Sequence, residues 1–238
     1  MPKFRHEIKL ALSQADYQLM SARLSSLLMR DENAGENGEY FIRSLYFDDA
    51  SHTAYREKLS GVADRKKYRL RIYNHSDSVI KLECKEKRGD RIKKRAVSVS
   101  RQAADGMVRG DFSELYKSDD PLCQEVLSLA KGRGLAPSVV VDYDREAYIH
   151  PIGNVRLTFD KALHAGISGA VSGADIFDKE LITLPVFPNG TVIFEIKYDE
   201  LLPTYIRDLV STAHGERIAL SKFCLCRDAL SLFKQKYL

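Results

Sequence analysis

Polar and apolar residues alternate along several stretches of this chain, and a period of two predicts β-strands. Successive side chains of a strand point to opposite faces, so a strand with one buried face shows this alternation. The pattern predicts seven or eight strands, within residues 4–11, 39–48, 65–73, 81–87, 91–97, 138–148, 155–161 and 191–198.

Helical signals lie between and after the predicted strands. Ser13 and Asp16 resemble the start of a helix with a leucine stripe, and Pro121 has the first-turn position of another. Further helices are predicted at residues 100–110, after 202–203 and at 220–237, with a turn or short helix at 49–57. We therefore expect one α+β domain, residues 1–238. Its antiparallel strands form a closed or nearly closed β-barrel, with helices packed around it, including one at the C-terminus.

Positive charge is concentrated in one part of the sequence. Residues 65–95 contain 13 Lys and Arg but 4 Asp and Glu, whereas the formal net charge of the whole chain is only +4. The rest of the chain is therefore net negative. This concentration favours one local anion site over a surface that is basic throughout, so we expect no nucleic-acid partner.

The cations of this basic region share strand faces. The alternating residues of two neighbouring strands are Lys67, Arg69 and Arg71, and Lys81, Glu83, Lys85 and Lys87. Cations that lie opposite one another on adjacent strands repel each other. Such a surface is therefore expected to face a polyanion.

Polar faces of other predicted strands carry the same residue types. They contain Arg5, Glu7, Lys9, Lys93, Tyr143, Arg145, Arg156, Glu195 and Lys197. Taken singly, each face is also what a solvated sheet would show. Taken together, in a sheet closed with these faces inward, they predict a cationic tunnel with a few carboxylates. Such a tunnel requires water, bound anions and a metal to offset repulsion and desolvation.

These residue types fit phosphate chemistry. The planar guanidinium of Arg donates two parallel hydrogen bonds to phosphate, and carboxylates bind Mg²⁺ or Mn²⁺, which bridge phosphate oxygens. Phosphoryl transfer depends mainly on positioning and charge stabilisation, so the lack of an evident nucleophile does not argue against it. The chain lacks a P-loop motif and a Gly-x-Gly-x-x-Gly motif, which excludes those two nucleotide-binding classes.

Localisation is predicted from what the sequence lacks. It has no apolar run of membrane-spanning length, and its first residues do not resemble a secretory signal, so we expect a cytoplasmic protein. Cys84, Cys123, Cys224 and Cys226 lack the spacing of zinc-ligand pairs and are expected to be reduced thiols.

Eight short motifs occur in a fixed order along nearly the whole chain. They are Arg5-His6-Glu7-Ile8-Lys9, Ser44-Leu45-Tyr46-Phe47-Asp48, Lys67-x-Arg69-x-Arg71-x-Tyr73, Leu82-Glu83-x-Lys85, Tyr143-x-Arg145, Val155-Arg156-x-Thr158-x-Asp160, Glu195-x-Lys197-Tyr198 and Ser221-Lys222-Phe223. No single motif is specific, but the ordered set resembles the vacuolar transporter chaperone (VTC) domain. That domain is the polyphosphate polymerase branch of the triphosphate tunnel metalloenzyme (CYTH-like) superfamily.

The resemblance implies a β-tunnel in which the γ-phosphate of ATP passes to a growing inorganic polyphosphate chain, with Mn²⁺ or Mg²⁺ as cofactor. It implies ATP and polyphosphate or pyrophosphate as ligands, and a membrane-protein partner is compatible with it. The implied catalytic, phosphate-binding residues are Lys9, Arg69, Arg71, Lys85, Lys93, Arg145, Arg156 and Lys197. Substrate-binding positions are Glu7, Lys67, Tyr143, Ser221 and Lys222, and the implied metal ligand is Glu195.

Three points stay open at this stage. Glu83 is either a second metal ligand or a structural partner of the neighbouring cations. Arg5 stands where the hydrolytic branch of the superfamily has the first Glu of its Glu-x-Glu-x-Lys motif, and this difference favours the polymerase branch. Ala219, in contrast, stands where the yeast-type polymerase domain has a Lys. The alternatives are a metal-dependent inorganic triphosphatase or nucleoside triphosphatase, and a non-catalytic polyphosphate-binding module.

Overall fold

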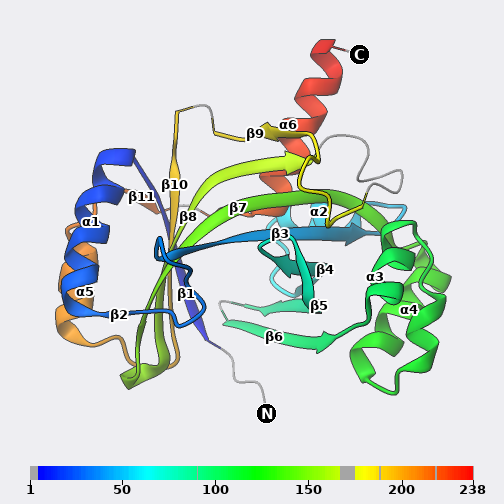
Figure 1. Cartoon of the computed structure of the whole chain (residues 1–238), viewed down its shortest axis with the longest axis horizontal. Coiled ribbons are helices and arrows are strands. Elements are labelled where there is room, and N and C mark those ends of the chain that lie inside the picture. The colour runs from blue at the N-terminus through cyan, green and yellow to red at the C-terminus, as the bar shows by residue number, and fades with distance from the viewer. Residues whose placement is uncertain (1–4, 90, 167–174, 188, 218, 238) are drawn as a thin grey trace.

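A computed structural model describes residues 5–89, 91–166, 175–187, 189–217 and 219–237 of the chain. One large antiparallel sheet runs through it, and helices lie on either side (Figure 1). The strands are β1 (His6–Leu12), β2 (Met29–Arg30), β3 (Glu39–Asp48), β4 (Arg65–Tyr73), β5 (Ser76–Arg88), β6 (Arg91–Ser98), β7 (Ala136–His150), β8 (Val155–Gly166), β9 (Thr183–Pro185), β10 (Val192–Tyr198) and β11 (Glu216–Arg217).

Six α-helices and two short 3₁₀ helices complete the described part of the chain. They are α1 (Gln14–Leu27), α2 (Thr53–Leu59), α3 (Arg101–Val108), η1 (Ser113–Lys117), α4 (Pro121–Arg133), η2 (Ile152–Asn154), α5 (Thr204–Ser211) and α6 (Lys222–Tyr237). The α+β class expected from the sequence is confirmed. None of the helices in the described ranges is long and apolar enough to cross a membrane.

The strands are ordered β11-β1-β10-β8-β7-β3-β4-β5-β6, with β2 paired to β7 and β9 to β8. The first strand therefore lies beside strands from the end of the chain. The expectation of seven or eight strands omitted β2, β9 and β11. These elements have two or three residues each, too few to show any periodicity.

The prediction of a closed barrel is not borne out, because the edges β1 and β6 do not form a continuous ladder. Within the described ranges they meet in one isolated bridge, in which the amide of Arg5 donates to Ile92 (3.0 Å) and that of Ile92 donates back (3.3 Å). Further along β1, Leu10 and Ala11 pair with β11, which occupies the edge that β6 would need. Alternation in the sequence predicts the face of each residue but not whether the two edges of a sheet meet. We refer to this junction as the β1–β6 seam.

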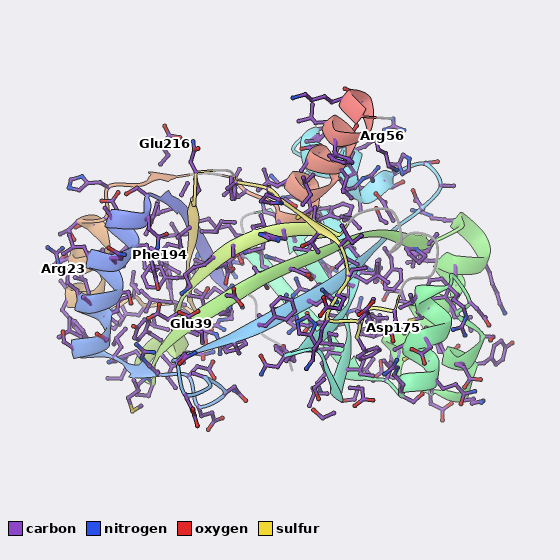
Figure 2. The ribbon with its side chains drawn as sticks, turned by 45° about the horizontal axis from the view of Figure 1, so that its top comes forward. Arg23, Glu39, Arg56, Asp175, Phe194 and Glu216 are labelled. Atoms are coloured by element: carbon purple, nitrogen blue, oxygen red, sulfur yellow. The ribbon has the colours of Figure 1, made fainter. Side chains whose placement is uncertain are left out.

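Two apolar clusters fill the outer face of the sheet, each beneath its own pair of helices. Under α1 and α5, residues such as Leu24 and Phe194 are buried, and Phe194 can be followed in Figure 2. Under α3 and α4, Met107 and Val126 pack on Leu70. These helices lie at opposite ends of the molecule (Figure 1).

The inner face is partly apolar and partly charged. Helix α6 packs onto its apolar part, where Phe223 and Cys226 lie in one cluster with Tyr46, Val139 and Ile193. Beyond this contact the face is polar. The first turn of α6 thus marks the border between the apolar core and the charged part of the inner face.

Candidate functional site

Strand pairing brings charged residues from distant parts of the sequence onto the inner face. Glu7 lies opposite Lys197, Lys9 opposite Glu195, and Lys67 opposite Lys85. We call this charged surface the basic face. Its cations are Lys9, Lys67, Arg69, Arg71, Lys85, Lys94, Arg145, Arg156, Lys197 and Lys222, and its carboxylates are Glu7, Glu83, Asp160 and Glu195.

Glu195 lies at the centre of the largest ion-pair network and is 4% exposed. Its carboxylate oxygens are 2.9 Å from Nζ of Lys9, 2.8 Å from that of Lys222 and 2.5 Å from that of Lys197. Burial alone would raise the pKa of Glu195, but these ammonium groups outweigh it and hold the pKa well below its usual range. The carboxylate is therefore ionised at any physiological pH.

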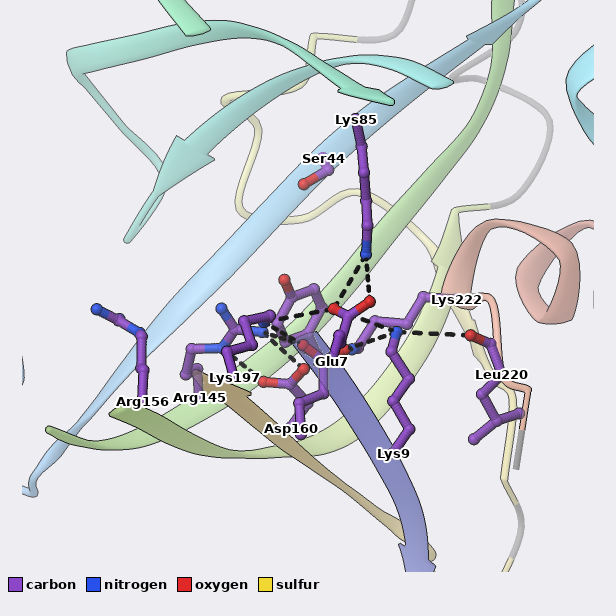
Figure 3. A network of polar contacts seen from close by, with 12 residues as sticks. Glu7, Lys9, Ser44, Lys85, Arg145, Arg156, Asp160, Lys197, Leu220 and Lys222 are labelled. Atoms are coloured by element: carbon purple, nitrogen blue, oxygen red, sulfur yellow. Dashed lines mark hydrogen bonds and ion pairs between the residues drawn. The ribbon is translucent and has the colours of Figure 1, made fainter. Parts of the chain in front are cut away.

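Asp160 is a second buried carboxylate that the sequence analysis quoted in a motif but did not select as a site residue. Arg145 donates two hydrogen bonds to it, at 2.6 and 2.7 Å, and Lys222 lies 2.5 Å away. Because Lys222 also contacts Glu195, it joins the two carboxylates across β8 and β10. Figure 3 shows Lys222 beside Asp160 and Arg145. The signal that could have identified Asp160 is its alternation with Arg156 and Thr158 on one strand.

Glu7 connects the network to the far side of the β1–β6 seam. Nζ of Lys85, on β5, donates to both oxygens of Glu7 at 3.0 and 2.8 Å (Figure 3). Burial raises the pKa of Glu7, but Lys9 and Lys85 reverse this and lower it. Burial also lowers the pKa of Lys85 to about 8, against the attraction of Glu7.

Glu83 forms the second network, with the cations of β4 and β6. Arg69 donates to its carboxylate at 2.8 Å, Arg71 lies 3.8 Å from it, and Lys94 forms a short ion pair with it. Two roles were considered for Glu83 from the sequence, a metal ligand and a structural partner of the neighbouring cations. This geometry supports the role of structural partner. The role of Glu83 as a metal ligand remains a prediction, and among the described residues no group of three or more potential ligands includes it.

Tyrosine and serine hydroxyls hold the two arginines of β4 in place. Arg71 donates to Ser44 at 3.2 Å and to Tyr143 at 2.9 Å, and Arg69 donates to Tyr46 at 2.7 Å. The ring of Tyr46 is buried in the apolar cluster beneath α6, and its hydroxyl lies at the basic face. Both guanidinium groups retain N–H donors for an anion.

Lys93 lies on the opposite face from the one predicted. Arg88 pairs with Arg91 across the β5–β6 hairpin, so odd-numbered residues of β5 lie opposite even-numbered residues of β6. Lys94 consequently lies opposite Lys85 on the basic face, and Lys93 lies opposite Glu86 on the outer face. The odd-numbered face of β4 and β5 does not continue into β6, because the hairpin turn changes which residues of β6 share that face.

Lys67 and Ser221 meet where α6 begins. Nζ of Lys67 donates to Oγ of Ser221 at 2.6 Å and lies 5.2 Å from the ring centre of Phe223. Burial lowers the pKa of Lys67 to about 7. Arg156 lies at another border of the basic face, where it donates to the hydroxyl of Tyr40 at 2.8 Å and pairs with Asp31.

Metal binding at this site depends on few donors. Among the described residues, no group of three or more His, Cys, Asp or Glu side chains is placed to hold a metal ion alone. Glu195 and Glu7 lie on adjacent strands of one face, in diagonal positions. Since Mg²⁺ is commonly held by one or two carboxylates plus phosphate oxygens, these residues fit an ion that a phosphate ligand helps to hold.

The antiparallel sheet, the helices outside it and the cationic, partly buried inner face are the arrangement expected of a triphosphate-tunnel fold. The chain belongs to the VTC domain family, whose model matches residues 4–231. None of the curated proteins matches it in sequence.

Solved structures share this fold at low sequence identity. One is the Hippeastrum protein HpAC1, an adenylyl cyclase candidate for which a dominant triphosphatase activity is described. It has a TM-score of 0.58 and 17% identity, over 94% of this chain and 95% of that one. Another is an adenylate cyclase candidate from Bacillus halodurans, with a TM-score of 0.55 and 12% identity over 92% and 95% of the two chains.

Proposed function

We propose that this protein is a polyphosphate polymerase that transfers the γ-phosphoryl group of ATP to inorganic polyphosphate or pyrophosphate. The observation that carries this proposal is the excess of cations over carboxylates on the basic face, where most of the cations are half-buried, in a member of the VTC domain family. Clustered cations that carboxylates do not fully neutralise are stabilised when a polyanion binds.

Each part of the basic face has a role in this proposal. Arg69 and Arg71 present guanidinium forks to the phosphates of ATP, and Lys85, Lys94 and Lys197 neutralise charge around them. In the transfer, an oxygen of the chain end bonds to the γ-phosphorus while the bond to the β–γ bridging oxygen breaks, and ADP leaves.

A divalent ion, Mn²⁺ or Mg²⁺, would be held by Glu195 and would neutralise charge on the phosphate oxygens. Lys9, Lys197 and Lys222 pair with Glu195, and each ammonium group has three N–H donors, so these groups can also donate to phosphate. Arg145 stays fixed by Asp160, which preserves the position of its remaining N–H donors.

The test is to incubate purified protein with ATP, pyrophosphate and Mn²⁺ and to follow polymer on gels together with released phosphate. Wild type should form polymer, and Glu195→Gln should reduce turnover at least 100-fold. The same substitution should not weaken metal-free binding of tripolyphosphate, because it removes a negative charge. Glu86→Gln, on the outer face of β5, is the matched control and should retain activity. Phosphate release without any polymer would refute polymerisation.

Triphosphatase activity is the second candidate, and the triphosphatase described for HpAC1 favours it. Both reactions would use the same cations, with water replacing the chain end as the acceptor. Arg5 pairs with Asp199 at 2.9 Å and contributes no carboxylate to the site, which supports the polymerase assignment. A non-catalytic polyphosphate-binding module would show steep salt dependence and no turnover with any metal.

A further inference from the structure

Lys67 and Ser221 form an amine–hydroxyl pair whose chemistry the proposed polymerase reaction does not use. Their polar atoms are 2.6 Å apart, closer than most hydrogen bonds of this kind. Within the described ranges Lys67 has no carboxylate partner, unlike Lys85 and Lys94, each of which pairs with a glutamate.

The surroundings of Lys67 favour a neutral amine. Burial lowers its pKa to about 7, and the cations Lys85, Arg65 and Lys9 act in the same direction against the thiol of Cys224. At slightly alkaline pH, much of this amine is unprotonated. A serine hydroxyl is a weak nucleophile until a neighbouring base accepts its proton, and an unprotonated lysine can be that base.

Ser221 is also located beside the proposed triphosphate site. The carbonyl of Leu220 accepts a hydrogen bond from Lys9 at 3.5 Å, and the ammonium of Lys222 lies 2.8 Å from Glu195. Both chain neighbours of Ser221 therefore contact the Glu195 network (Figure 3). The hydroxyl lies on the border of the basic face, between this network and Lys67.

A phosphate group on Ser221 would be well accommodated. The residue precedes α6, and its Oγ accepts a hydrogen bond from the amide of Cys224 at 3.4 Å. Phosphate at the N-terminus of a helix is stabilised by free amide groups and by the helix dipole. Lys67 and Lys222 would add two neighbouring positive charges.

We propose that Ser221 accepts the γ-phosphoryl group of a nucleoside triphosphate, with Lys67 as its general base. A bond forms between Oγ and the γ-phosphorus, the bond to the β–γ bridging oxygen breaks, and the nucleoside diphosphate leaves. The proton of the hydroxyl passes to Nζ of Lys67. This inference rests on the proposed function and adds to it, because phosphoserine offers the oxygen on which the first polyphosphate unit can be built.

The experiment is to incubate the protein with ATP and Mn²⁺, quench with acid and map phosphate by peptide mass spectrometry. Acid cleaves phosphoanhydrides but leaves phosphoserine, so one phosphate on the Ser221 peptide is expected. Ser221→Ala should abolish it, whereas Ser98→Ala, at a serine that contacts Lys81, should not.

Lys67→Arg tests the base separately, because arginine keeps the positive charge but does not accept a proton. This variant should bind tripolyphosphate within about threefold of wild type and form phosphoserine at least 100-fold more slowly. In the wild type the rate should rise from pH 6 to 8, and in Lys67→Arg this rise should disappear.

The outcomes separate this inference from the proposed function. Polymer formed on added pyrophosphate, with an unmodified Ser221 peptide, would overturn the inference and leave polymerisation intact. Neither polymer nor phosphoserine would overturn both. Phosphoserine at an unchanged rate in Lys67→Arg would remove the general-base role.

Discussion

Individual carboxylates neutralise part of the positive charge of the basic face. Glu195 and Asp160 are nearly inaccessible, and each contacts at least two cations. Removing one member of such a buried ion pair typically costs about 3–5 kcal/mol, because the remaining charge stays buried. Glu195 and Asp160 therefore stabilise the buried cations when no ligand is bound, in addition to any part they take in the proposed reaction.

The corrected register of β6 makes a prediction about Lys94. Lys94→Gln should weaken tripolyphosphate binding about fivefold, since a partly buried ion pair contributes on the order of 1 kcal/mol. Lys93→Gln, one residue earlier but on the outer face, should change it less than twofold. Titration calorimetry of both variants measures the difference, and equal losses would contradict the register.

The pH dependence of anion binding follows from two lysines. Burial lowers the pKa of Lys85 and of Lys94 to about 8 each, against the attraction of Glu7 and Glu83. A bound polyanion favours the charged lysines, so binding takes up protons, and affinity should fall as the pH rises from 7 to 9. Lys94→Arg should reduce this fall, because arginine stays charged. An affinity that is flat or rises over this range would contradict the assignment.

Much of the site can be predicted from the sequence, because alternation assigns each residue to a face. It places Arg69 and Arg71 with Lys85 correctly, and it groups Lys9 with Glu195 once the strands are ordered. It fails at Lys93, since only the hairpin turn determines which residues face each other across β5 and β6.

At the scale of elements, Asp48 at the end of β3 links helices α2 and α6 through hydrogen bonds. Its carboxylate accepts hydrogen bonds from the amides of Ala54 and Tyr55, at 2.9 and 3.2 Å, and from Arg227 at 2.9 Å. Arg227 also stacks over Tyr55, 4.4 Å from its ring centre. This arrangement fixes the start of α6.

Asp48→Asn should lower the free energy of unfolding by about 1–3 kcal/mol, because hydrogen bonds to a charged acceptor are lost or weakened. Asp49→Asn is the matched control. Asp49 accepts from the amide of Thr53, and among the described residues no arginine lies within ion-pair distance of it, so the loss of stability on its substitution should be smaller. Denaturant titrations compare the two, and an equal or larger effect at Asp49 would contradict the role given to Asp48.

Long elements were predicted well because periodicity and caps are local. Ser13 and Ser100 cap their helices through side-chain oxygens, and Pro121 occupies the first turn of α4, as local rules require. The pairing of β1 with β10 joins residues from opposite ends of the chain. No local signal contains that information.

For the whole molecule, the β1–β6 seam offers a route by which the polymer of the proposed reaction would leave. A closed barrel would release a chain only from its ends, whereas among the described residues this seam has one backbone bridge and the Glu7–Lys85 ion pair. If the seam opens, a long polyanion can leave sideways.

A disulfide across the seam tests this path. Arg5 and Ile92 are directly paired, and antiparallel partners of this kind are about 5.5 Å apart, within reach of a disulfide. The oxidised Arg5→Cys/Ile92→Cys protein should bind tripolyphosphate normally but exchange long polyphosphate at least several-fold more slowly than its reduced form. Identical exchange in both forms would rule out release through the seam.

The position of β1 between β10 and β11 has a consequence for synthesis. This strand is synthesised before its neighbours in the sheet, so it cannot pair with them until the strands and helices between β1 and β10 have been made. Unpaired strands are prone to associate with other chains, and charged residues along them oppose this. Glu7 and Lys9 place such charges on β1, and we expect them to oppose association of the nascent protein until β10 is made.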